Sequence, residues 1–315
     1  MTIGELIPVE ADLDRAPDLL TGATTARLAP EYCNLEYWLH AVAQGTLRGL
    51  IDGHRAGTET PEWMKVDGPL RTALLEELAF RSIAEEMATR ALGHLVRLAP
   101  DVEKMEFFTT QLMDEARHAR VFRGHLIDLG VPSDDVDATL EEVAGPDRDR
   151  VLRPLEAFGL RLAEQEDFIG GVALLTILVE GVLAPSAELS ERKWRLLDPA
   201  AAEIERAAGI DEIRHLSVGS EIIRQHLQDR PDELSRLREL IECGQKIWME
   251  LPVLDVVLRR EELFQVGMQE LSDHLVGCEI WPGRLMLDTD APERLQAALT
   301  WSANMQQDRL NYMGL

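Results

Sequence analysis

Aromatic residues are scarce in this sequence of 315 residues: they make up 5% of it, whereas hydrophobic residues as a whole make up 45%. The apolar content is therefore mainly Leu, Ala, Val and Ile, a mixture that favours packed helices over sheets, which are enriched in β-branched and aromatic residues. Cysteine is also rare, and Cys33, Cys243 and Cys278 form no CxxC pair. This spacing argues against a disulfide framework and predicts buried thiols in a reduced, cytoplasmic protein.

Basic residues are few. Lys and Arg number 32 against 57 Asp and Glu, which gives a formal net charge of -25. A polyanion of this size is repelled by nucleic acid and by anionic membranes, so we expect neither as a partner. The first fourteen residues lack a cationic stretch followed by an apolar one, which predicts no signal peptide. The most apolar stretch, residues 168–185, is interrupted by Glu180 and is short for a membrane span.

Glycine and proline interrupt the sequence at long intervals, and the segments between them have helical periodicity. No low-complexity linker and no convincing strand pattern is present, so we predict one all-α domain over residues 1–315. Asp198-Pro199 is a strong helix start, with Asp as the N-cap and Pro at the first helical position. The predicted helices cover residues 30–53, 69–98, 102–129, 133–144, 150–190 with a bend near Gly170-Gly171, 199–227, 231–251, 255–276 and 291–312.

One pentapeptide occurs twice in nearly the same form. Residues 114–118 read Asp-Glu-Ala-Arg-His and residues 211–215 read Asp-Glu-Ile-Arg-His, each in the middle of a long predicted helix. A Glu three residues before a His lies on the same helical face, so both side chains can reach one metal ion. A single Glu-x-x-His pair is weak evidence, but two pairs with the same flanking Asp and Arg are hard to attribute to chance.

Two further carboxylates are candidates for the same site. Glu180 is the only acid in an apolar run, where a carboxylate must be protonated, paired with a cation or bound to metal. On the helix over residues 69–98, Glu85 shares its face with apolar residues, whereas Glu86 shares a more polar face. Glu85 is therefore the better inward carboxylate, although Arg81 lies one turn before it. Gly170, Gly171 and Gly181 either allow a bulge beside Glu180 or permit close helix packing.

Four Glu and two His on four helices resemble the ligand set of the ferritin-like dimetal carboxylate superfamily, in which two helices give one Glu each and two give Glu-x-x-His. The match covers about residues 74–226. The resemblance implies a ferritin-like four-helix bundle over about residues 69–228, with additional helices over about 30–53 and 232–313. The implied metal ligands, which would also be the catalytic residues, are Glu85, Glu115, His118, Glu180, Glu212 and His215.

The resemblance also implies a role for each residue. Glu115 and Glu212 would bridge two iron ions, or one manganese and one iron. Asp114 and Asp211 would accept the N–H of the ligand histidines across the bundle, and Arg117 and Arg214 would neutralise part of the buried acidity. His125 and His226 follow the ligand histidines on the same helical faces and remain alternative ligands or proton carriers. Some amine N-oxygenases of the superfamily have a third histidine where this chain has Ala208.

The implied function is an oxygen-activating oxidoreductase that acts on a small organic substrate. Chain length and family resemblance favour N-hydroxylation or N-oxygenation of an amine or hydrazine in a biosynthetic pathway. Alternatives are a C-hydroxylase, a desaturase, an oxidase like the ribonucleotide reductase small subunit, and an iron-binding ferroxidase. No GxGxxG or Walker sequence is present, so electrons would come from a separate reductase or from the substrate. We also expect a homodimer.

Overall fold

The computed structural model describes residues 7–315 and confirms the prediction of an all-α protein. Residues 1–6, which belong to the segment used to predict the lack of a signal peptide, lie outside the described residues. The helices are α1 (Leu19–Thr25), α2 (Leu35–Tyr37), α3 (Pro69–Leu98), α4 (Val102–Asp128), α5 (Val136–Asp147), α6 (Arg153–Glu164), α7 (Phe168–Ala173), α8 (Gly181–Trp194), α9 (Pro199–Asp229), α10 (Leu234–Glu250), α11 (Val253–Glu270) and α12 (Ala291–Met313).

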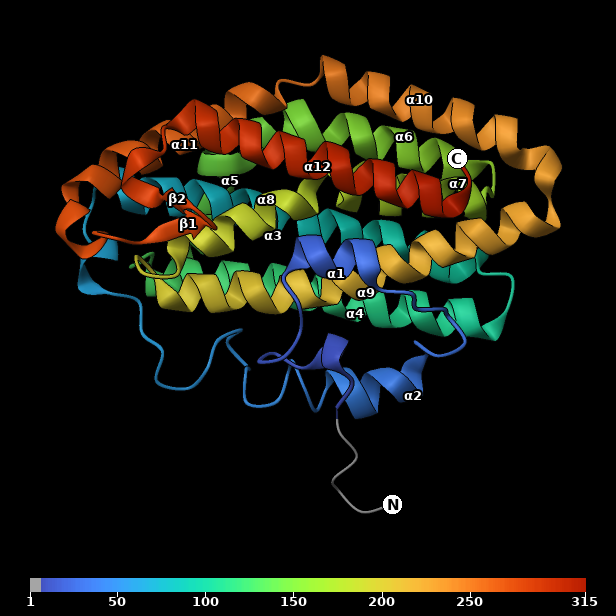
Figure 1. Ribbon diagram of the computed structural model, residues 1–315, viewed down its shortest axis with the longest axis horizontal. Helices are drawn as coiled ribbons and strands as arrows, with labels where there is room; N and C mark the ends of the chain where they lie inside the picture. The colour runs from blue at the N-terminus through green and yellow to red at the C-terminus, as the bar shows by residue number, and fades with distance from the viewer. Residues whose placement is uncertain (1–6) are drawn as a thin grey trace.

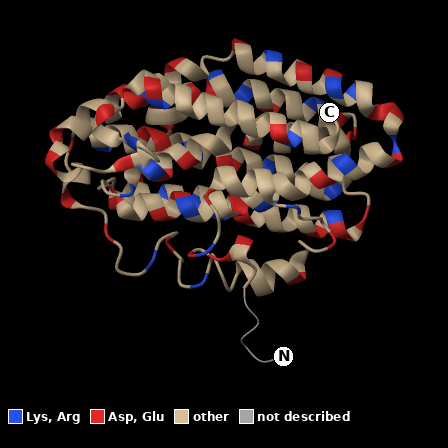
Figure 2. Cartoon of the chain, viewed as in Figure 1, with Lys and Arg blue, Asp and Glu red and all other residues tan. Residues whose placement is uncertain are grey.

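Long helices that pack in pairs form the centre of the molecule. Helix α3 packs against α4, α8 packs against α9, and α4 also contacts α9 (Figure 1). Helices α11 and α12 contact α3 and α8, while α1 and α2 contact α9 and α4. Acidic side chains are spread over these helices rather than gathered in one segment (Figure 2). The four helices predicted to carry the metal ligands are therefore neighbours.

Capping residues determine where several of the helices begin, in some cases at the predicted position and in others not. Asp198 accepts a hydrogen bond from the backbone of Ala201 and begins α9, as predicted. The break between α6 and α7 lies at residues 165–167 rather than at Gly170-Gly171, because Asp167 caps α7 by accepting from the Gly170 N–H. Helix α5 continues through Gly145 and Pro146, where a break is expected, and widens into a π-helical turn.

Three other sequence expectations are wrong. The predicted helix over 30–53 is limited to α2 and the π-helical segment Trp38–Val42, because Gly49 and Gly53 adopt positive φ angles and the chain turns repeatedly. A short hairpin, β1 (Glu279–Trp281) with β2 (Arg284–Leu285), forms around Pro282-Gly283, a turn dipeptide. The thiol of Cys33 is buried as expected, but Cys243 is exposed.

The stretch Phe168–Trp194 has the length and hydropathy of a membrane-spanning helix, but 72% of its most apolar window is buried inside the protein. Such burial is typical of a core helix, so the hydropathy alone is weak evidence for a span. Within this stretch, the π-helical segment Leu174–Glu180 joins α7 to α8 and ends at the acid singled out above.

His125 connects α4 to the beginning of α9. Its Nε2 lies 2.9 Å from Asp198 and its Nδ1 lies 3.5 Å from Asp128. Burial alone would lower the pKa of His125, but the neighbouring carboxylates of Asp128 and Asp198 outweigh burial and raise the pKa to about 9. His125 is therefore a structural residue that lies away from the Glu/His cluster described below.

We expect His125→Gln to destabilise the protein in a pH-dependent way. Because the folded-state pKa is above the unfolded value, the stabilisation is complete below pH 6.5 and is lost as the pH rises through about 9. The shift corresponds to about 3 kcal/mol at the lower pH. Urea unfolding of both proteins at pH 6 and pH 10 measures this, with the exposed His40→Gln as the control. A difference in stability that is the same at both pH values would contradict the prediction.

Candidate metal centre

The two repeated segments bring their functional side chains together. Glu115 and His118 lie on α4, and Glu212 and His215 lie on α9. The Glu115 carboxylate lies between the histidines: one oxygen is 3.1 Å from His118 Nδ1 and the other is 3.2 Å from His215 Nδ1. Glu115 can therefore contribute one carboxylate oxygen beside each of the two histidines.

Glu85 and Glu180 complete two such groups. Ligand atoms of Glu85, Glu115 and His118 lie within 4.8 Å of one another, and so do those of Glu115, Glu180 and His215. Both groups could hold a metal ion, and five of the six predicted ligands belong to them. The sixth, Glu212, is not part of these groups, and its carboxylate oxygen lies 3.7 Å from Nδ1 of His215. Glu212 therefore lies beside the group that contains His215, and its role as a bridging ligand stays a prediction.

Glu85 and Glu86 differ in the way their helical faces predict. Glu85 belongs to the cluster, is partly exposed and lines a pocket. Glu86 lies at the surface, where it pairs with Arg90 at 2.7 Å and with Arg123 at 3.3 Å. Arg81 lies one helical turn before Glu85 and is a possible partner for it in the sequence. In the structure, Arg81 forms an ion pair with Glu205.

Polar atoms without hydrogen-bond partners test whether the site fits a metal ion. Within residues 7–315, Glu115 Oε1, Glu180 Oε2, Glu212 Oε2 and His215 Nδ1 are buried and make no hydrogen bond. Leaving such groups unpaired is costly, and the cost is removed when they coordinate a cation. Glu115 Oε1 and Glu212 Oε2 lie 3.2 Å and 3.7 Å from His215 Nδ1, so the residues present fit a metal centre.

The acid–base properties of the cluster support the same conclusion. Burial raises the pKa of Glu85 well above its usual value, and the charge of Glu115 adds to the effect. Burial and the charge of Glu212 act in the same way on the pKa of Glu180. The pKa of Glu115 is lowered, because its close contacts with the imidazoles of His118 and His215 outweigh its burial. Crowded carboxylates that favour protonation bind a divalent cation in place of protons.

The repeated aspartates pair with the histidines of the opposite helix. Asp211 on α9 lies 3.2 Å from Nε2 of His118, and Asp114 on α4 lies 3.3 Å from Nε2 of His215. Each ring therefore directs Nδ1 to the cluster and Nε2 to a carboxylate. Such a carboxylate fixes the tautomer and orientation of a metal-binding imidazole.

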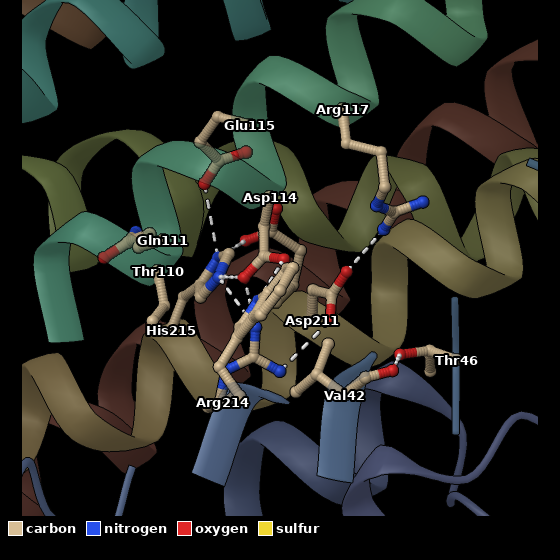
Figure 3. A network of polar contacts seen from close by, with 12 residues as sticks. Val42, Thr46, Thr110, Gln111, Asp114, Glu115, Arg117, Asp211, Arg214 and His215 are labelled. Carbon is tan, nitrogen blue, oxygen red and sulfur yellow. Dashed lines mark hydrogen bonds and ion pairs between the residues drawn. The ribbon is translucent and has the colours of Figure 1, made fainter. Parts of the chain in front are cut away.

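Two arginines neutralise these aspartates. Arg117 donates to Asp211 at 2.5 Å, and Arg214 donates to Asp114 and, at 3.1 Å, to Asp211 (Figure 3). Arg214 is 1% exposed and lies between both carboxylates. The pentapeptide repeat thus encodes two layers of the site: Glu and His at its centre, and Asp and Arg around them.

Two polar residues that contact the cluster are not among those predicted from the sequence. Gln111 lies one helical turn before Glu115 and donates to Glu180 at 2.5 Å, a position that the helical face could have revealed. Trp38, from the segment after α2, donates its indole N–H to Asp114 at 2.9 Å. No local signal marks Trp38, because its partner is far away in the sequence.

The C-terminal helices hold the π-helical segment that positions Glu180. A π-helical turn leaves some carbonyls without regular helical partners. Gln306 on α12 donates to the carbonyl of Ile177 at 3.0 Å, and Trp248 on α10 donates to that of Leu178. Gly219 on α9 lets this segment approach closely, because a Cβ there would lie 2.0 Å from Thr176 Oγ1. The helices outside the ligand-bearing set therefore contribute to the geometry of the site.

Comparison of the sequence with protein-family models gives no match. Comparison with curated proteins likewise finds no significant relative.

Replacing Asp211 tests its role beside His118. We expect Asp211→Ala to weaken metal binding by roughly 10–100-fold, because His118 loses the acceptor that orients it. Asp211→Asn should have a smaller effect, because the amide keeps an acceptor oxygen. Titration of Fe(II) under anaerobic conditions measures both, with the exposed Asp229→Ala as the control. Equal affinities for all three variants would show that Asp211 does not position the ligand.

Proposed function

We propose that the cluster binds two iron ions, or one manganese and one iron, and that the protein is an oxygen-activating oxidoreductase of the ferritin-like dimetal carboxylate superfamily. The single observation that carries this proposal is the position of Glu115, whose two oxygens face the Nδ1 atoms of two histidines from different helices. A carboxylate shared in this way suits a pair of ions. The rest of the proposed ligand set is Glu85, Glu180 and Glu212.

The donor set favours iron or manganese. Carboxylate oxygens with one imidazole per ion suit Fe(II) and Mn(II), whereas thiolate ligands, typical of structural zinc sites, do not contribute to the described cluster. When bound, the metal pair would supply the redox chemistry by which dioxygen oxidises a substrate. The protein residues bind and orient the ions, and the apolar side chains of the π-helical segment exclude water from Glu180.

Among possible reactions, we favour N-hydroxylation or N-oxygenation of an amine or hydrazine, with C-hydroxylation, desaturation and ferroxidase activity as alternatives. Ala208 takes the place of the third histidine found in some N-oxygenases, so the proposed site uses six protein ligands. The proposal includes a single ferritin-like domain, a cytoplasmic homodimer and an external electron donor. It includes no nucleic-acid or membrane partner.

Metal analysis of protein purified without added iron tests the proposal. We expect about two ions per chain, chiefly iron, because the shared carboxylate joins two ligand groups. Anaerobic addition of Fe(II) followed by oxygen should give an absorbance change, and amine oxidation by the loaded protein would separate an oxygenase from a ferroxidase. Glu86→Ala, which removes the neighbouring carboxylate that pairs with Arg90 and Arg123, is the matched control and should keep the normal metal content. Zinc alone at one ion per chain, with no gain from Fe(II), would overturn the proposal.

A further inference from the structure

A pocket with an almost entirely apolar wall lies between α3, α6 and the segment around Glu180. Its volume is about 160 Å³. One side is formed by small residues of α3, including Ala84 and Ala88, and the opposite side includes Leu155 and Gly159 of α6. The few polar residues that line it include Arg90, which is exposed, so the pocket has a polar rim toward solvent.

This pocket flanks both carboxylates that complete the two ligand groups. Ala84 directly precedes Glu85 on α3, and Ala88 follows it by nearly one turn. On the other wall, Val179 directly precedes Glu180, and Leu183 follows it by nearly one turn. A molecule held here therefore lies next to the two helical segments that present Glu85 and Glu180.

A second, smaller pocket extends the first toward the cluster. It has a volume of about 100 Å³, shares Ala84 and Leu183 with the apolar pocket, and is lined by Glu85 itself. Its lining also contains buried charges, including Lys193, whose Nζ lies 2.5 Å from Glu261. The apolar pocket therefore borders a second pocket whose lining includes Glu85, one of the proposed metal ligands.

We propose that the apolar pocket binds the hydrocarbon body of the substrate, a group of benzene-ring size. This inference rests on the proposed function and adds the substrate class to it. An apolar cavity of about 150 Å³ stays dry and binds benzene, so a pocket of this volume accepts one ring or a short alkyl group. Burying a hydroxyl or a charge against these side chains has no compensating hydrogen bond, so polar groups point to the rim or to Glu85. The substrate is therefore an arene or short alkyl compound whose reacting atom lies at one end.

Binding of fluorobenzene to the full-length protein, followed by fluorine NMR, tests the inference. We expect saturable binding both before and after removal of metal, and competition by toluene but not by hydroquinone, which has two hydroxyls. Ala88→Phe should weaken binding by at least about tenfold, because its phenyl ring takes the space of the ligand. Ala88→Leu is the milder second variant and should weaken binding less. Ala138→Phe, an exposed alanine on α5, is the matched control and should bind normally.

The outcomes separate this inference from the proposed function. Ala88→Phe should keep the metal content of the wild type, because Ala88 is not a ligand. Normal metal content without saturable fluorobenzene binding would overturn the substrate class and leave the metal centre intact. Fluorobenzene binding that Ala88→Phe and Ala88→Leu do not change would place the ligand elsewhere and also overturn the inference. Binding in a protein that takes up no iron would contradict the proposed function alone.

Discussion

Replacing Glu115 by glutamine is expected to abolish binding of both metal ions. Glu115 is the one residue common to the two ligand groups, and each of its oxygens faces a different histidine. Glutamine has nearly the same shape, but it is neutral and directs an amide N–H₂ toward one imidazole. The metal content should therefore fall from about two ions per chain to near zero.

Glu180→Gln provides the matched comparison, because it removes a carboxylate from one ligand group only. Glu85, Glu115 and His118 remain within 4.8 Å of one another, so about one ion per chain should remain. Elemental analysis and anaerobic Fe(II) titration measure both variants, while circular dichroism checks that the helices persist. If Glu115→Gln retained as much metal as Glu180→Gln, Glu115 would not be shared between the two ions.

The parts of the fold that the sequence predicts are those with local signals. The bounds of α3 match the expected range because Pro69 begins it and Ala99-Pro100 ends it. The Asp198 cap similarly fixes the beginning of α9. The region around α2 was mispredicted because its conformation depends on contacts such as that between Trp38 and Asp114, which periodicity does not encode.

The candidate site was largely predictable because its chemistry is repeated and locally unusual. Two matching pentapeptides identify the histidines, and an isolated acid in an apolar run identifies Glu180. The distances from His215 Nδ1 to Glu115 (3.2 Å) and to Glu212 (3.7 Å) are not predictable from the sequence, because α4 and α9 are packed together from distant parts of the chain. The support of the π-helical segment by Gln306 and Trp248 also depends on helices that are distant in sequence.

Replacing Arg214 by methionine is expected to have the largest effect on stability. Arg214 is 1% exposed and is the only side chain that donates to both repeated aspartates in the described part of the chain. Burial would lower the pKa of Arg214, but the charges of Asp114 and Asp211 outweigh it and raise the pKa, so the guanidinium stays charged. Methionine fills similar space but leaves both carboxylates without this partner. Removing one member of a buried ion-pair network costs about 3–5 kcal/mol.

Urea unfolding of the metal-free proteins measures this cost separately from metal binding. Arg195→Met is the control, because Arg195 is about half exposed and pairs with Glu191 one helical turn away, an arrangement that contributes little to stability. Adding Asp114→Asn to Arg214→Met should restore part of the lost stability, because it removes one of the two carboxylate charges that have lost Arg214 as their partner. A loss for Arg214→Met no larger than that of the control, or no recovery in the double variant, would show that the aspartates do not depend on Arg214. The charge of Asp211 would then be balanced by Arg117, and Asp114 would be held by the indole N–H of Trp38 and the imidazole of His215.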